Sequence, residues 1–247
     1  MTAVYLNQST PQSATPATKR WALPPETVHL WWLSLDGPAT DADADLLSRD
    51  EHCRAERLAH SEAARRFRRG RAHLRRVLAS YLGTAPRTLR FAYTPNGKPS
   101  IQDAPHLSFS LAHSGDIGLL AVTYRRRLGV DVELSDRTAR WLAVARRCLS
   151  EDAWRRLQAL PEADRVQAVQ RGWTRHEALL KASGQAALRR LLRWETPCTA
   201  HPAAFTIQDR HGGSWLVKDV VREGVCAALA VERWLDSTPE IVTAGWL

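Results

Sequence analysis

The stretch Gly129-Val130-Asp131-Val132-Glu133 decides how this sequence of 247 residues is interpreted. Its valines favour a β-strand, in which side chains alternate between two faces, so that Asp131 and Glu133 share one face. If that face were buried, removing both carboxylates from water would cost several kcal/mol of free energy unless a cation lay between them. Their oxygens suit Mg²⁺, which takes one or two carboxylates and completes its shell with water and substrate phosphate. The alternative is an edge strand whose two acids face solvent.

A second pair of charged residues lies within a helix predicted over residues 162–183. Glu177 and Lys181 are four residues apart, so their side chains lie on one helix face about one turn from each other. On an exposed surface such a pair is common and contributes only ~0.3–0.5 kcal/mol. In the functional alternative, Glu177 joins the two strand acids around a cation while Lys181 reaches a phosphate.

The composition describes a basic protein and excludes several classes of protein. Lys and Arg number 35 against 26 Asp and Glu, and the net charge of +9 favours anionic partners. The four cysteines include no C-x-x-C pair, which argues against a zinc ribbon or a disulfide framework and for a reducing cytosol. There is no apolar run as long as a membrane span, and residues 1–19 do not resemble a signal peptide. We therefore expect a cytoplasmic protein with no membrane partner.

The predicted elements occur in the same order twice. Residues 1–20, rich in Ser, Thr, Pro, Ala and Gln, are expected to form a disordered leader. A strand, helices and further strands follow, predicted over residues 28–35, 45–58, 61–82, 89–93, 106–111 and 117–124. The same order recurs over residues 129–133, 139–148, 151–160, 162–183, 205–207, 215–221 and 225–232. We predict an α+β fold with two lobes of similar plan, residues 21–127 and 128–236, and a C-terminal tail, residues 237–247.

The helix predicted over residues 61–82 is amphipathic, with Ser61 as its N-cap and Gly83 as its C′ residue. One stripe is apolar and consists of Phe67, Leu74, Val77, Leu78, Tyr81 and Leu82. Arginines fill most of the remaining surface, at positions 65, 66, 68, 69, 71, 75 and 76. We expect most of these arginines to form a solvated face.

Five motifs, in one order and with compatible spacing, resemble those of the 4′-phosphopantetheinyl transferase superfamily. Two of them are Gly129 to Glu133 and, some forty residues later, Trp173-Thr174-x-x-Glu177-Ala178-x-x-Lys181. The other three lie upstream: the basic stretch Arg54 to Gly70, the turn Asn96-Gly97-Lys98-Pro99, and a strand Leu107 to Ser114 that ends in Ala-His-Ser. The likeness covers residues 25–235 and is closer to the two-lobed, surfactin-synthetase-activating type than to the short trimeric type.

The resemblance implies a fold, an activity and partners. The fold is a pseudo-twofold arrangement of two α+β lobes with coenzyme A bound in the cleft between them. The activity is that of a holo-carrier-protein synthase, which moves 4′-phosphopantetheine from coenzyme A to a serine of an apo acyl or peptidyl carrier protein and releases 3′,5′-ADP. Such carriers serve polyketide, nonribosomal peptide, siderophore or fatty-acid synthesis. The expected cofactor is Mg²⁺, and because one chain contains both lobes we expect a monomer.

The resemblance also assigns roles to individual residues. The metal ligands would be Asp131, Glu133 and Glu177. The catalytic residues would be Glu177, which accepts the serine proton, Lys181, which neutralises phosphate oxygens, and Asp131. The residues that contact coenzyme A would be Arg54, Arg66, Lys98, Pro99, His113 and Lys181. Without the resemblance, His113 could cap a hairpin, Lys98 could be a solvated turn lysine and Arg66 could belong to the solvated helix face.

Three positions depart from the family's pattern, and two other classes of function stay open. His176 stands where the family has a lysine, Ala112 replaces the first serine of a Ser-His-Ser motif, and Ser61 lies where a second basic residue is common. These departures permit a catalytically silent relative that binds coenzyme A or a carrier protein. The net positive charge permits a nucleic-acid-binding protein, although the sequence carries no recognisable docking motif for nucleic acid.

Overall fold

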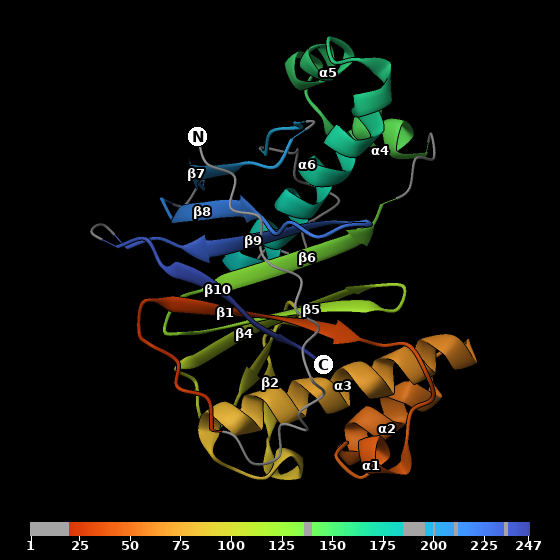
Figure 1. The fold of residues 1–247 in the computed structure, drawn as a ribbon, viewed down its shortest axis with the longest axis vertical. Coiled ribbons are helices and arrows are strands. Elements are labelled where there is room, and N and C mark those ends of the chain that lie inside the picture. Colours follow the sequence, from red (N-terminus) through yellow and green to blue (C-terminus); the bar gives the residue numbers. More distant parts are fainter. Residues whose placement is uncertain (1–19, 136–139, 185–195, 200, 210–211, 235–236) are drawn as a thin grey trace.

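Two four-stranded β-sheets, each covered by one long helix, form the centre of the molecule (Figure 1). The structure is a computed structural model that describes residues 20–135, 140–184, 196–199, 201–209, 212–234 and 237–247. Apart from Arg20, the predicted leader of residues 1–20 lies outside the described residues.

The chain forms an N-terminal lobe, then a C-terminal lobe, then one last strand. The N-terminal lobe contains β1 (Thr27–Ser34), α1 (Asp41–Ala44), α2 (Arg49–Glu56), α3 (Ser61–Leu82), the 3-10 turn η1 (Pro86–Thr88), β2 (Phe91–Tyr93), β3 (Pro99–Ile101), β4 (Leu107–Ser114) and β5 (Ile117–Tyr124). The C-terminal lobe contains β6 (Leu128–Leu134), α4 (Arg140–Cys148), α5 (Glu151–Gln158), α6 (Glu162–Ser183), β7 (Ala204–Gln208), β8 (Ser214–Asp219) and β9 (Val225–Glu232). The last strand is β10 (Glu240–Trp246).

The two large sheets share one pairing plan. Their strand orders are β10-β1-β5-β4 and β6-β9-β8-β7, and β2 and β3 form a separate hairpin. In each lobe the first strand pairs antiparallel with the last, β1 with β5 and β6 with β9. That last strand pairs antiparallel with the strand before it, β4 or β8. The repeated plan confirms the predicted two-lobed α+β fold; the exact boundaries, residues 21–127 and 128–236, stay a prediction.

Alternating side chains place the two sheets between the two helices. On β1, Trp31 and Leu33 pack into a core shared with α3, whereas Leu30 and Trp32 face the second sheet. Apolar residues of β6 and β9, among them Val130, complete the core between the sheets. The other face of β8 and β9 packs against α6. The order of layers is therefore α3, first sheet, second sheet and α6, with both lobes contributing to the central core.

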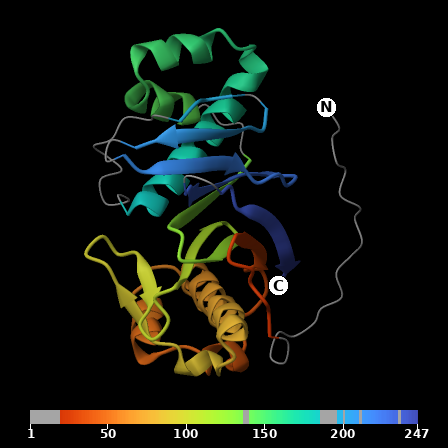
Figure 2. The same ribbon diagram turned by 90° about the vertical axis from the view of Figure 1, so that its left-hand side faces the viewer.

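The predicted C-terminal tail of residues 237–247 is wrong, because β10 occupies most of it. This strand pairs in parallel with β1, from Thr27 opposite Glu240 onward, and so belongs to the sheet of the N-terminal lobe. Figure 2 shows it descending from the upper lobe to lie beside the lower one. Its partner strand lies some two hundred residues earlier in the chain, so no local pattern near the C-terminus indicates the pairing.

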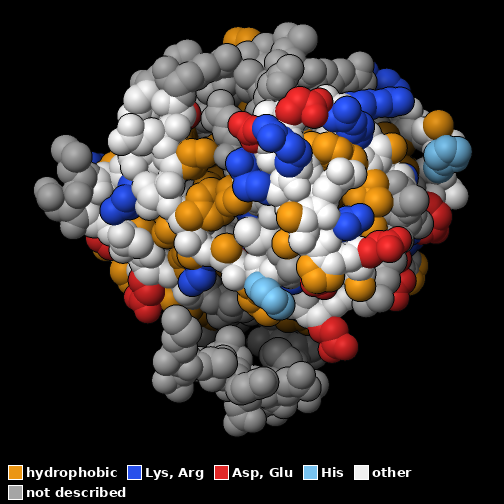
Figure 3. All heavy atoms as spheres, turned by 90° about the horizontal axis from the view of Figure 1, so that it is seen from above, with side chains coloured by type: hydrophobic (Ala, Val, Ile, Leu, Met, Phe, Trp, Pro, Cys, Tyr) orange, Lys and Arg blue, Asp and Glu red, His pale blue; other side chains and the backbone are white. Residues whose placement is uncertain are grey.

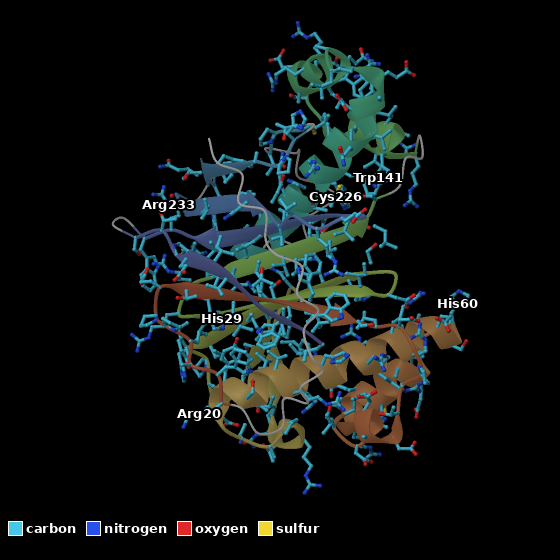
Figure 4. The ribbon with its side chains drawn as sticks, viewed as in Figure 1. Arg20, His29, His60, Trp141, Cys226 and Arg233 are labelled. Carbon is cyan, nitrogen blue, oxygen red and sulfur yellow. The ribbon has the colours of Figure 1, made fainter. Side chains whose placement is uncertain are left out.

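Helix boundaries differ from the prediction in the N-terminal lobe. The helix predicted over residues 45–58 is the shorter α2, which starts at Arg49 because Ser48 forms a capping box. The prediction missed α1, which lies before that range and starts at the capping box of Thr40. In α3 the N-cap is His60, labelled in Figure 4, and not Ser61. The end of α3 is confirmed, since Gly83 takes the left-handed conformation that terminates it.

The described helices include none that is both long enough and apolar enough to cross a membrane.

Candidate active site

A cavity of about 330 Å³ opens where the two lobes meet. Side chains from α2, α3, β4, the turn between β2 and β3, and the end of α6 line it. The six residues that the sequence predicts to contact coenzyme A all lie in its wall: Arg54, Arg66, Lys98, Pro99, His113 and Lys181. The structure therefore brings together residues separated by up to 127 positions, whereas their individual contacts with a ligand stay predictions.

Lys181, in the cavity wall, forms an ion pair that joins α6 to β6. Lys181 Nζ lies 2.6 Å from Asp131 Oδ1 and donates a hydrogen bond to the Val130 carbonyl at 3.1 Å. Asp131 is 7% exposed. Burial raises the pKa of its carboxyl group to about 6, although the Lys181 ammonium opposes this shift. An acid that is so costly to bury remains ionised near pH 7 because a cation lies beside it.

A close helix–strand crossing makes this pair possible. A Cβ atom on Gly129 would lie 2.2 Å from the Ala178 carbonyl oxygen and 2.8 Å from Lys181 Cβ. No side chain fits in that space, so α6 lies directly on the backbone of β6. The glycine at the start of the acidic strand therefore brings Lys181 within reach of Asp131.

Glu177 faces the same strand as Lys181. Residues 170, 174, 177 and 181 form one stripe along α6, since their spacing follows the helical repeat. Both ends of the stripe contact β6, through Lys181 and through Gln170 Nε2, which donates to the Leu134 carbonyl at 3.3 Å. Glu177 lies between these contacts and is 4% exposed. The interpretation of Glu177 and Lys181 as an exposed surface pair is therefore wrong.

The donor set in this region suits a divalent cation. Asp131 Oδ2 is buried and accepts no hydrogen bond in the described part of the chain, and Glu133 lies on the same face of β6. The Ser114 hydroxyl donates to Glu133 Oε2 at 3.0 Å. Among the described residues, no group of three or more His, Cys, Asp and Glu side chains is arranged to hold a metal ion. A site with one or two carboxylates fits Mg²⁺, whose remaining positions go to water and substrate phosphate. The predicted three-acid site, with Glu177, stays a prediction.

Several basic side chains line the cavity. Arg66 Nε bonds to Asp116 Oδ1 at 2.8 Å, and Arg54 lies over the Phe67 ring at 5.4 Å. The pKa of His113 is lowered, mainly by desolvation in the cavity wall and then by the charges of Lys181 and Arg66. A neutral His113 near pH 7 can donate one hydrogen bond to an anionic ligand. Arg54, Arg66 and Lys181 supply the positive charge.

Lys98 lines the cavity, but its ammonium points into the protein. Lys98 Nζ donates to three backbone carbonyls, those of Leu128 at 3.0 Å, Lys181 at 2.8 Å and Ala182 at 3.4 Å. The side chain is therefore neither solvated nor directed at the cavity.

The comparisons with known proteins agree with this geometry. A family model described as the 4′-phosphopantetheinyl transferase superfamily matches residues 127–230. The protein named 4′-phosphopantetheinyl transferase HetI, from Nostoc sp. PCC 7120, is 35% identical over 83% of this chain and 88% of its own length. The chain belongs to the 4′-phosphopantetheinyl transferase superfamily.

Two further relatives extend the comparison. The Synechocystis sp. PCC 6803 protein slr0495 is 33% identical over 64% of this chain and 65% of its own length. The Bacillus subtilis protein named 4′-phosphopantetheinyl transferase Sfp is 27% identical over 55% of this chain and 58% of its own length. The family and the transferase activity predicted from the motifs are thereby confirmed.

None of the three side chains that depart from the family pattern lines the cavity of this transferase, and Ser61 is exposed at the start of α3. Ala112 is 5% exposed and packs into the core between the sheets, so a serine there would not face the cavity. His176 is 2% exposed, and burial lowers its pKa to about 4. A buried His176 outside the cavity wall is not placed to contact a phosphate there.

The arginines of α3 are mostly paired, so the prediction of a solvated face is wrong. Arg71 and Arg75 are 8% and 1% exposed and bind the buried Glu51 of α2. Four others pair with acids from elsewhere in the transferase: Arg65 and Arg66 with Asp116, and Arg69 and Arg76 with Asp43. The acids lie up to 51 residues away, so the pattern of the helix alone does not reveal them.

Sequence reasoning missed two serines that join the lobes beside the site. Ser110 Oγ accepts a hydrogen bond from the Val130 N–H at 3.1 Å, and Ser114 Oγ accepts one from the Leu134 N–H at 3.2 Å. Both serines lie on β4, four residues apart, and both amides lie on β6, four residues apart. The four-residue spacing of the two serines, which matches that of the two amides, is the sequence signal that could indicate contact between β4 and β6.

Proposed function

We propose that this transferase moves 4′-phosphopantetheine from coenzyme A to a serine hydroxyl of an apo acyl or peptidyl carrier protein. The observation that carries the proposal is the cavity, which has Arg54, Arg66, His113 and Lys181 in its wall, with Lys181 paired to the buried Asp131. Cations in a cavity wall attract a ligand with several phosphates, and the Lys181 ammonium would balance the charge that develops as a phosphate leaves. The chain is proposed to act as a cytoplasmic monomer.

Each residue has a stated part in the reaction. Arg54, Arg66 and His113 would hold the phosphates of coenzyme A. The serine oxygen attacks the β-phosphate, so one P–O bond forms to the carrier and the P–O bond of the diphosphate breaks, releasing 3′,5′-ADP. Glu177 would accept the serine proton, and its burial between the contacts of α6 with β6 holds it in one place. Lys181 would donate to the phosphate oxygens that gain charge.

Mg²⁺ fits Asp131 and Glu133, with Glu177 as the third proposed ligand. When bound, it supplies electrostatic stabilisation of the diphosphate oxygens. Lys181 neutralises Asp131 in this structure and also lines the cavity, where it would face the phosphates of a bound ligand.

Transfer to a carrier protein tests the proposal directly. The chain is incubated with coenzyme A, Mg²⁺ and a panel of apo acyl and peptidyl carriers, and intact mass is recorded for each carrier. The expected result is a gain of one phosphopantetheine on at least one carrier and none on the same carrier with its acceptor serine replaced by alanine. Binding of coenzyme A with no transfer to any carrier would instead indicate a silent relative.

The nucleic-acid alternative has weaker support. On the face shown in Figure 3, basic side chains are interspersed with acidic and hydrophobic ones and form no continuous stripe among the described residues. The paired arginines of α3 leave less free positive charge than the sequence indicates. Tight binding of duplex or single strands at physiological salt, without binding of coenzyme A, would favour this alternative.

A further inference from the structure

The ammonium of Lys98 has the hydrogen-bonding environment of a structural cation. A lysine ammonium has three N–H donors and no acceptor. Three backbone carbonyls lie within 2.8–3.4 Å of Lys98 Nζ. All three donors are therefore used, and the group can reach a coenzyme A phosphate only by giving up one of these bonds.

The three carbonyls belong to the other lobe. Lys98 lies in the turn between β2 and β3 of the N-terminal lobe, whereas Leu128 begins β6, and Lys181 and Ala182 lie in the last turn of α6. Asn96, in the same turn, donates from Nδ2 to the Gly184 carbonyl at 2.8 Å. In Figure 2 the yellow hairpin of β2 and β3 rises from the lower lobe toward the end of this helix.

The end of α6 needs such donors. The last carbonyls of a helix have no partner within the helix and carry partial negative charge, which a cation stabilises. Gly184 ends α6 in the left-handed conformation and its N–H bonds the Leu180 carbonyl, while the Lys181 and Ala182 carbonyls accept from Lys98 Nζ. The Lys98 ammonium supplies both the donors and the charge.

Lys181 is consequently held at both of its ends. Its carbonyl accepts from Lys98 Nζ, and its own ammonium binds Asp131 and the Val130 carbonyl. We propose that Lys98 is a positioning residue, which fixes the last turn of α6 to the opposite lobe and thereby sets Lys181 in the cavity, and that its ammonium does not bind coenzyme A. This inference rests on the proposed function only where its test measures transfer.

The burial of the group agrees with this role. Burial lowers the pKa of Lys98 to about 8, with a smaller contribution from the nearby charge of Arg127. The amine is therefore still mostly protonated at pH 7 and has the three N–H donors that the three carbonyls accept from.

Kinetics of Lys98→Met separate positioning from ligand binding. Methionine keeps the apolar stem but removes the donors. We expect kcat to fall about 10- to 100-fold, the effect of misplacing a catalytic group by about 1 Å, while KM for coenzyme A changes less than about 3-fold. The matched control is Lys218→Met, an exposed lysine of β8, which should leave both constants unchanged. A rise of tenfold or more in KM with kcat intact would overturn the proposal, because that is the result expected of a phosphate contact.

A double-mutant cycle tests whether Lys98 acts through Lys181. If it does, Lys98→Met should lower kcat less than about 2-fold in a Lys181→Ala background, although it lowers kcat strongly in the wild type. If kcat of the double variant instead falls by the product of the two single-variant losses, the proposal is overturned.

Amide hydrogen exchange gives a readout that does not need activity. Lys98→Met should raise the exchange rates of residues 178–184 about 10-fold or more relative to wild type, and Lys218→Met should not. If Lys98→Met does not fold, Asn96→Ala, which removes only the bond to Gly184, should raise the same rates by a smaller factor. If exchange at the end of α6 is the same in Lys98→Met as in wild type, the proposal about Lys98 is overturned, whether or not the chain transfers phosphopantetheine. If instead the wild type is inactive but Lys98→Met still raises exchange there, only the proposed function is contradicted.

Discussion

At the scale of single residues, Asp131 is a carboxylate in an unusually buried position. It is almost fully buried, one of its oxygens binds Lys181 and the other accepts no hydrogen bond in the described part of the chain. Burial raises the pKa of the carboxyl group, and the adjacent Lys181 ammonium opposes this rise and favours the anion. An oxygen held ready in this way is suited to a metal ion and adds little to the stability of the fold.

Replacement of Asp131 by asparagine should therefore separate activity from folding. Asp131→Asn keeps the shape and an acceptor for Lys181 but removes the charge, so transfer should fall at least ~10²-fold, the loss expected when several kcal/mol of electrostatic stabilisation disappear. The melting temperature should change by less than about 4 °C, which corresponds to about 1 kcal/mol in a protein of this size. The control is Asp103→Asn, an exposed acid paired with Arg90, which should leave transfer intact. Full activity of Asp131→Asn would remove this residue from the metal site.

His73 should make the stability of the protein sensitive to acid. Its Nε2 lies 3.1 Å from the Ser34 carbonyl, and burial together with Arg69 and Arg76 lowers its pKa to about 4 from the ordinary 6.5. Between these two values the unfolded chain binds a proton that the folded chain does not, so the free energy of unfolding falls as the pH drops from 6.5 to 4.

The variant His73→Gln keeps an N–H for Ser34 but cannot titrate. Across that range, wild type should lose up to about 3 kcal/mol more stability than the variant. Urea unfolding at pH 7 and at pH 4.5 measures the difference. Equal losses for the two proteins would show that His73 is not responsible.

At the scale of elements, the sequence predicted what local chemistry determines. The strand around Asp131, the three helices of the C-terminal lobe and the glycine that ends α6 were predicted correctly, because periodicity and capping residues are local signals. All six residues that the motifs predict to contact coenzyme A also lie in the cavity wall. Two features are not predicted because they depend on residues far away in the sequence. They are the ion pairs of the α3 arginines and the pairing of β10 with β1.

The role of Lys98 shows the same limit within the site. A lysine after Asn-Gly reads as an exposed turn residue, and the family resemblance reads it as a ligand contact. Its three acceptors lie thirty or more residues away, so neither interpretation could include them.

The crossing of α6 over β6 depends on Gly129. Gly129→Ala would place a methyl group 2.2 Å from the Ala178 carbonyl oxygen and 2.5 Å from the Ala182 nitrogen, and both are backbone atoms that cannot turn aside. We expect a loss of about 2–3 kcal/mol in the free energy of unfolding, the usual cost of overpacking, together with a loss of transfer as Lys181 moves away from Asp131.

The matched control for this substitution is Gly70→Ala in α3. There a new Cβ would meet only Leu35 Cδ2, at an ordinary 3.7 Å. Because alanine is favoured over glycine inside a helix, Gly70→Ala should be neutral or raise stability by up to about 1 kcal/mol. Chemical denaturation of both variants measures the contrast, and equal stability of Gly129→Ala and wild type would show that the crossing is looser than described.

At the scale of the whole molecule, the chain returns to its first lobe after completing the second. Strand β10 pairs with β1, and the last residue bonds the same strand: the Leu247 N–H donates to the Trp32 carbonyl at 3.0 Å, and the Ser34 N–H donates to the Leu247 carbonyl at 2.6 Å. Arg222, from the C-terminal lobe, lies between the rings of Trp32 and Trp246, with its guanidinium carbon 4.9 and 4.1 Å from their centres. The two lobes are therefore in contact through Arg222 and β10 as well as through the hydrogen bonds of Lys98.

Removal of residues 238–247 should destabilise the N-terminal lobe in particular. Without β10, β1 becomes an exposed edge strand and loses its parallel ladder, and each lost hydrogen bond costs about 0.5–1.5 kcal/mol. We expect a melting temperature lower by ten degrees or more, as several kcal/mol would produce, and a weaker protection by coenzyme A, because α3 and β4 supply much of the cavity wall. The single substitution Trp246→Ala leaves the ladder intact and should cost far less. A truncated chain that melts and transfers like wild type would mean that β10 lies on the lobe without supporting it.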